Sequence, residues 1–161
     1  GEDENPPKSL LDNSLYKSMM DCELVLRFFA IRETVLHDLK GSLRHILDKS
    51  MKKRQKISPS EINEFRCLFL ETLRRLVDSL GNDFIILPNT NRLSRPLYDA
   101  LMVAASLHQE VNLQDRSLEI SARLTEALSD PEKYEILVGR GNTVEAIKER
   151  VSLAKKILMN Q

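Results

Sequence analysis

The strongest local signal in the sequence marks the start of a long amphipathic helix. In the stretch ISPSE, Ser58 suits the N-cap position, Pro59 suits the first helical position, and Glu61 stands three residues after the serine. This is a capping box, which predicts that a helix begins here, and Gly81 is a natural end for it. Apolar residues recur between them at steps of three and four: Ile62, Phe65, Phe69, Leu73, Leu76 and Leu80.

Comparable signals along the chain predict one compact all-α domain of about six to seven helices, with no convincing sheet. Besides the helix after Ser58, helices are expected over 14–33 (with a start near Ser9 as the alternative), 43–54, 94–108, 116–129, 131–138 and 143–159. The stretch from Asp83 to Arg92 is the least certain part. A packed extended loop is favoured there over a short strand, because no partner strand is evident.

Several details of these helices can be predicted from residue spacing. Ser42 and Asn142 are expected to be N-caps, and Glu145 stands three residues after the asparagine. Leu118, Ser121, Leu124 and Leu128 share one face of the helix over 116–129. The last helix carries an apolar stripe of Val144, Ile147, Val151, Ala154 and Leu158.

The two ends of the chain suggest how the domain is delimited. Residues 1–13 are polar, contain two prolines, and are expected to form a flexible leader or a remnant of cloning. Residues 14–161 are expected to form the all-α domain. Because the chain begins with GEDENPPKS and has no initiator methionine, we expect a fragment of a longer protein.

The composition favours a cytoplasmic globular protein that does not enter a membrane. Of the 161 residues, 42% are hydrophobic, and 24 Lys and Arg balance 24 Asp and Glu, so any polyanion site must be local. No apolar run approaches the roughly 20 residues of a membrane span. Cys22 and Cys67 are interpreted as buried free thiols, with a disulfide as the alternative.

Glu23 and Arg27 are the first candidate site residues. They stand four positions apart with the acid first, which is the favourable order for an ion pair on a helix. The surrounding residues are largely apolar, so the pair is interpreted as a structural clasp of a half-buried helix. A catalytic role would need a second acid, a metal or a nucleophile, and the sequence does not indicate one.

The run DKSMKKRQK is the candidate nucleic-acid contact, through Lys49, Lys52, Lys53, Arg54 and Lys56. The alternative is an ordinary helix end, where cations complement the helix dipole. No aromatic residue interleaves the run, so base stacking is not indicated.

The loop GRGNT is a candidate anion site, formed by Gly139, Arg140, Gly141, Asn142 and Thr143 ahead of a helix N-terminus. It lacks the lysine of a phosphate-binding P-loop. A glycine that ends one helix, followed by a residue that caps the next, would also explain it.

Motifs of catalytic and metal sites are not evident. His37, His45 and His108 are the only histidines, and neither HExxH nor CxxC occurs. His37 and His45 are expected to face solvent. We therefore expect no metal, no cofactor and no catalytic residue in this chain.

The order of several segments resembles a known bacterial family. The segments are MDCELVLRFFAIRE, GSLRHILDKSM, EINEFRCLFLETLRRL, RPLYDALMVAASL and GNTVEAIKERV. Together they are similar to the helical region that follows the nucleotidase domain in ParB/sulfiredoxin-superfamily proteins, which include the S half of GmrSD-type restriction enzymes and related phage-defence proteins. The resemblance spans about residues 14–155, and ELVLRFF and PLYDALMVA are its most specific parts.

The resemblance implies a non-catalytic role for this chain. In such proteins nucleotide hydrolysis is attributed to an N-terminal domain with a D-G-Q-[QR]-R motif, and some members add an HNH-type nuclease. Neither motif occurs here. The chain is expected to act as a scaffold, in self-association as a homodimer, or in coupling to DNA, with the parent's nucleotidase domain as its partner. The alternatives are a nucleic-acid-binding module that uses Lys49–Lys56 and a helical protein-interaction adaptor.

Overall fold

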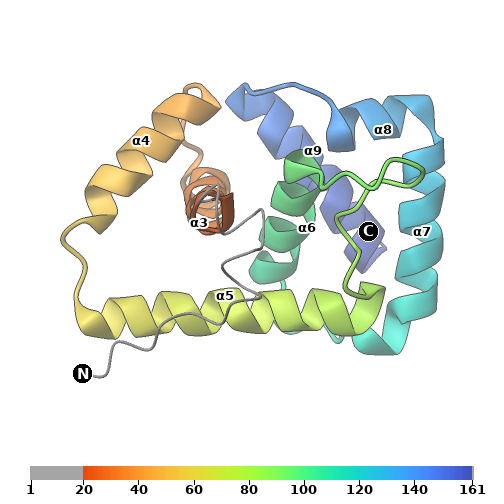
Figure 1. The fold of residues 1–161 in the computed structure, drawn as a ribbon, viewed down its shortest axis with the longest axis horizontal. Helices are drawn as coiled ribbons and strands as arrows, with labels where there is room; N and C mark the ends of the chain where they lie inside the picture. The colour runs from red at the N-terminus through yellow and green to blue at the C-terminus, as the bar shows by residue number, and fades with distance from the viewer. Residues whose placement is uncertain (1–19, 161) are drawn as a thin grey trace.

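The computed structural model describes residues 20–160 and confirms the all-α prediction (Figure 1). Within this range it contains seven α-helices, one short 3-10 helix and no strand beyond two isolated bridges. The α-helices are α3 (Met20–His37), α4 (Leu43–Arg54), α5 (Pro59–Leu80), α6 (Arg95–Leu107), α7 (Ser117–Ser129), α8 (Pro131–Val138) and α9 (Val144–Met159). The 3-10 helix η1 (Gln114–Arg116) leads into α7. The expected leader over 1–13 and the start of the first helix lie outside the described residues.

The predicted capping box is present at the start of α5. The Ser58 hydroxyl accepts from the backbone N–H of Glu61 at 3.2 Å, and the Glu61 carboxylate accepts from the N–H of Ser58 at 2.8 Å. The hydroxyls of Ser42 and Ser94 likewise accept from the N–H of His45 and Leu97 and cap α4 and α6, without a reciprocal acid. These local hydrogen bonds satisfy N–H groups that the first turn of a helix would otherwise leave free.

Helix α6 forms the centre of the core. Every residue from 97 to 106 is buried, and α3, α5, α8 and α9 pack around it (Figure 1). Small residues at Ala100, Ala104 and Ala105 let neighbouring helices approach closely. The predicted stripe of α9 is buried against this core, as expected from its spacing.

Two elements extend away from this bundle, and we call them the arm: α4 and the first half of α5, residues 43–70. Figure 1 shows α4 and α5 as two sides of an angle with α3 seen end-on inside it. The main contact of α4 is with α3. The buried residues of α5, namely Thr72, Leu76 and Ser79, all lie in its second half. The first half of α5 therefore extends beyond the bundle.

Four sequence predictions are wrong in detail. Leu118 is 88% exposed, because the buried face of α7 is formed by Ile120, Leu124 and Ala127 instead. The N-cap of α9 is Thr143, whose hydroxyl accepts from the N–H of Ala146. The carbonyl of Asn142 instead accepts from the N–H of Leu43.

The third error concerns the cysteines, which are free as expected but exposed instead of buried. The stretch from Asp83 to Arg92 is a loop and not a strand, as predicted, but it is built largely of turns instead of being extended, and one bridge joins Ile86 to Leu93. Asn89 and Asn91 adopt positive φ angles of 65° and 49° in it, a conformation that asparagine tolerates better than most residues. Phe84 anchors this loop in the core.

Candidate functional site

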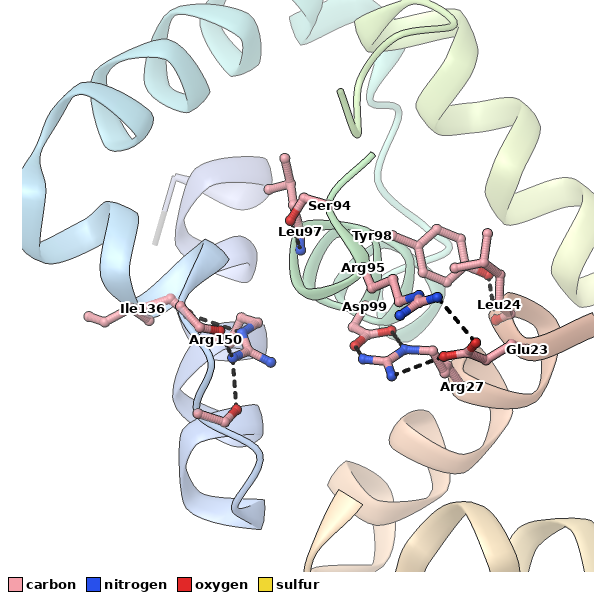
Figure 2. A network of polar contacts seen from close by, with 12 residues as sticks. Glu23, Leu24, Arg27, Ser94, Arg95, Leu97, Tyr98, Asp99, Ile136 and Arg150 are labelled. Carbon is pink, nitrogen blue, oxygen red and sulfur yellow. Dashed lines mark hydrogen bonds and ion pairs between the residues drawn. The ribbon is translucent and has the colours of Figure 1, made fainter. Parts of the chain in front are cut away.

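Arg27 lies at the centre of a buried polar network that joins α3 to α6 (Figure 2). Its Nε donates to Asp99 Oδ1 at 3.0 Å, and its Nη2 forms a second, short contact with Asp99 Oδ2. Both residues are buried, and Asp99 is fully inaccessible. A planar guanidinium that meets both oxygens of a carboxylate gives a strong and directional contact. Arg27 and Asp99 therefore fix the position of α3 across the central helix.

The predicted pair of Glu23 and Arg27 is also present, but it forms the outer part of the network. Glu23 Oε1 lies 3.7 Å from Arg27 Nη1, and Glu23 Oε2 lies 3.5 Å from Arg95 Nη2. Glu23 is partly exposed, so solvent weakens both contacts. Nearby, the Tyr98 hydroxyl donates to the Leu24 carbonyl at 2.8 Å and adds a second link between the two helices. Figure 2 shows all of these contacts converging on one side of α6.

Sequence reasoning missed Asp99, although a signal was available. It is the only acid in the otherwise apolar helix RPLYDALMVAASL. A carboxylate on a fully buried helix requires a charged or hydrogen-bonding partner. Burial raises the pKa of Asp99 to about 6, and the Arg27 guanidinium opposes that rise. The contacts of both carboxylate oxygens with the Arg27 guanidinium provide the counter-charge that the buried carboxylate requires. Burial and the neighbouring Asp99 charge raise the pKa of Tyr98 above its ordinary value.

A second buried arginine organises the GRGNT loop. Arg150, on α9, donates from Nε to the Ile136 carbonyl at 3.0 Å, and from Nη2 to the carbonyls of Gly139 and Gly141 at 3.1 and 2.9 Å. Gly139 is required for this close turn, since a Cβ there would lie 2.2 Å from the Glu135 carbonyl oxygen. The loop carbonyls therefore face an internal cation.

The same loop also joins the last helix to the arm. Besides the hydrogen bond from Leu43 to Asn142, Thr143 forms an isolated bridge with Ser42. Arg140, Asn142 and Thr143 are exposed. The turn at the glycines and the cap at Thr143 therefore explain the GRGNT sequence without a bound anion. The anion site stays a prediction.

The basic run lies on the arm, mostly on α4. Lys49, Lys52, Lys53 and Lys56 are exposed, whereas Arg54 is half-buried. Across residues 43–56 of the arm, six of the seven charged residues are Lys or Arg, and the set includes Arg44, which is exposed and was not among the candidates. The arm thus concentrates positive charge in a chain whose formal net charge is zero.

Two members of the run have structural partners. Lys53 forms a short ion pair with Glu33 of α3. The guanidinium of Arg54 lies over two adjacent aromatic rings, 5.4 Å from the centroids of Phe29 and Phe65, and it also contacts Ser50 and Glu33. Partial burial alone would raise the pKa of the Glu33 carboxyl. The nearby charges of Lys53 and Arg54 together have the larger effect, so the pKa of this carboxyl is lowered. A polyanion would therefore contact Arg44, Lys49, Lys52 and Lys56.

An apolar groove lies where the first half of α5 passes α3, with a volume of about 410 Å³. Its apolar lining consists of Val25 and Phe29 from α3, Ile57 from the loop, and Ile62, Phe65, Phe69 and Leu70 from α5. Of the large hydrophobic residues that are exposed in the described part of the chain, all but Leu118 lie on α3, α4 or α5. The exposed apolar surface is therefore concentrated beside the arm.

Chemical sites of other kinds are not apparent between residues 20 and 160. No group of three His, Cys, Asp or Glu side chains in that range is arranged to hold a metal ion. His37 and His45 face solvent as predicted, and His108 Nδ1 lies 3.5 Å from a Glu110 carboxylate oxygen. In the same range, no helix combines the length and apolar character needed to cross a membrane.

The fold and these surfaces define a class of protein: an all-helical domain with a tightly packed bundle, an internal ion-pair network, and an arm that carries basic and apolar surface. No family model, curated protein or solved structure matches the chain.

Proposed function

We propose that this chain is a non-catalytic helical scaffold domain that binds other macromolecules through its arm and acts in the bacterial cytoplasm. The observation that carries the proposal is the division of its surface. In the described part of the chain, the large apolar residues of the bundle around α6 are buried or half-buried except Leu118, while the other exposed large apolar residues and the basic cluster lie on or beside the arm. Contiguous exposed apolar surface is typical of interaction sites.

The resemblance to the helical region of GmrS-like restriction and phage-defence proteins agrees with this proposal. Its two most specific segments, ELVLRFF and PLYDALMVA, contain Arg27 and Asp99, the two halves of the buried ion pair. The resembling residues therefore include those that hold α3 against α6. In such a protein, the arm would contact the nucleotidase domain, a second copy of the chain, or DNA.

A pair of matched substitutions in the product of the complete gene tests the proposal. Ile62→Asp places a charge on the exposed apolar surface of the arm, and Leu118→Asp places the same charge on exposed apolar surface of α7. Neither side chain is buried, so both variants should unfold like the wild type. We expect Ile62→Asp to impair nucleotide-dependent DNA cleavage and Leu118→Asp to leave it unchanged. Equal effects, or none, would contradict a role for the arm.

A second candidate function is polyanion binding by the arm. The specific observation in its favour is the excess of exposed lysine and arginine over residues 43–56. Contacts with phosphates would be electrostatic and therefore strongly salt-dependent. Because Arg54 packs over two aromatic rings, its replacement would also change the folded structure, so it is not used to test this function.

The test is fluorescence anisotropy of a labelled DNA duplex titrated with the chain at several salt concentrations. Replacing Lys49, Lys52 and Lys56 by alanine should weaken binding and reduce the log-log salt slope by about 0.9 for each lysine that neutralises a phosphate. A control variant replaces three exposed cations outside α4, namely Arg74, Arg92 and Lys156. An equal loss in both variants would indicate a general charge effect and contradict a site on the arm.

A further inference from the structure

We propose that the groove between α3 and the first half of α5 binds one amphipathic helix whose polar flank carries carboxylates. This inference rests on the proposed scaffold function and names the class of partner that the arm would hold. It concerns the apolar face of the arm and does not depend on the exposed lysines of α4.

Phe29, Phe65 and Phe69 form the aromatic lining of the groove, and they pack against the buried ring of Phe28. The centroids of Phe29 and Phe65 are 5.0 Å apart, and those of Phe28 and Phe69 are 5.5 Å apart in an edge-on arrangement. Phe28 and Phe29 lie on α3, and both side chains are buried in the hydrophobic core. Such a lining is preformed, so a ligand would not have to order it on binding.

The sides of the groove are apolar and open to solvent. Val25, Ile62 and Leu70 are 38%, 51% and 46% exposed, respectively. From Ile62 to Leu70 the lining residues of α5 follow helical spacing over about two turns, or roughly 12 Å. A helix that inserts apolar residues at positions i, i+3 or i+4, and i+7 matches a groove of this length.

The charge of the groove selects among amphipathic helices. Its charged lining residues are Arg54 and Arg66, and no acidic residue lines it. Arg54 is already paired with Glu33, whereas Arg66 is exposed and forms no ion pair within the described part of the chain. A carboxylate beside the apolar stripe of a ligand would meet Arg66, and a lysine there would be repelled.

The inference is tested with the full chain and two synthetic peptides of about 18 residues, long enough to form a helix. Both peptides carry leucines at helical spacing, with glutamates on the flanks of one and lysines on the flanks of the other. Binding is measured by isothermal titration at low and moderate salt. We expect the glutamate peptide to bind about tenfold more tightly, and added salt to reduce the difference.

Three variants identify the site. Ile62→Asp should abolish binding of the glutamate peptide, and Leu118→Asp should leave it unchanged, since Leu118 lies outside the groove. Arg66→Glu should reverse the order of the two peptides. Equal binding of both peptides, no binding of either, or an unchanged order in Arg66→Glu would overturn the inference.

Sedimentation of the chain alone tests whether a second copy of the chain, instead of an acidic helix, occupies the groove. A concentration-dependent dimer that Ile62→Asp dissociates would show that a second copy occupies the groove, and it would overturn the acidic helix as its ligand. If the peptides fail but Ile62→Asp still impairs the complete gene product, the scaffold function stands and only the class of partner is wrong. If the peptides bind as expected but that product is unaffected, the scaffold function fails instead.

Discussion

The contact between Arg27 and Asp99 makes a quantitative prediction about stability. Replacing Arg27 with methionine keeps much of the length of the side chain but removes the charge that faces Asp99. Both side chains are at most 8% exposed, so the carboxylate would be left buried and without its main counterion. Removing one partner of a buried ion pair costs about 3–5 kcal/mol of unfolding free energy. This is a large fraction of the total free energy of unfolding of a domain, which is roughly 5–15 kcal/mol.

The loss should grow with pH. Burial already raises the pKa of Asp99 to about 6 in the presence of Arg27. Without the guanidinium, the pKa of Asp99 in the folded variant should rise further above its value in the unfolded chain. The folded variant then binds a proton that the unfolded chain does not, so its stability is highest at low pH and falls as pH rises through that raised pKa. Relative to the wild type, the slope reaches at most about 1.4 kcal/mol per pH unit above pH 6.

Urea unfolding followed by far-ultraviolet circular dichroism at pH 5, 6, 7 and 8 measures this. Combining Arg27→Met with Asp99→Leu removes both charges and should recover most of the lost stability, with little pH dependence. A deficit below about 1 kcal/mol at pH 8, or one that is the same at every pH, would refute the assignment of Arg27 and Asp99 as a buried, mutually dependent pair.

Three further substitutions distinguish structural from surface roles, each measured by urea unfolding against the wild type. Glu23→Gln should cost less than about 1 kcal/mol, because Glu23 is partly exposed at the outer end of the network; a cost like that of Arg27→Met would contradict this. Arg54→Ala should cost about 1–2 kcal/mol, since its guanidinium packs over two aromatic rings, whereas Lys52→Ala should change stability by less than about 0.5 kcal/mol; equal effects would be inconsistent with these positions. Gly139→Ala should cost about 1–3 kcal/mol because the new methyl group would collide with the carbonyl of Glu135, and an unaffected variant would show that the turn relaxes freely.

The elements of this fold that depend on local chemistry could be predicted from the sequence. The capping box of α5 involves residues three positions apart, so Ser58 and Glu61 determine it without reference to the rest of the chain. The stripe of α9 was likewise correct, because its spacing matches one face of a helix. By contrast, Leu118 was misplaced because periodicity alone did not identify which face of α7 meets the core.

Features that depend on distant neighbours could not be predicted in the same way. Asp99 lies 72 residues from Arg27, and only the packing of α6 against α3 brings them together. The roles of Lys52 and Arg54 differ although they are two positions apart, because only Arg54 reaches the aromatic rings. The apolar stripe of α5 is present as predicted. The spacing does not show, however, that α5 is longer than the bundle surface against which it packs. For this reason Ile62 is exposed in a groove.

The proposal that this chain is the helical scaffold domain of a GmrS-like protein is tested most directly by reading the native coding sequence upstream of Gly1 for about 150–200 codons, the length of one domain. The account predicts an in-frame ParB-like segment that contains a D-G-Q-[QR]-R motif. A start codon immediately before this segment would contradict it.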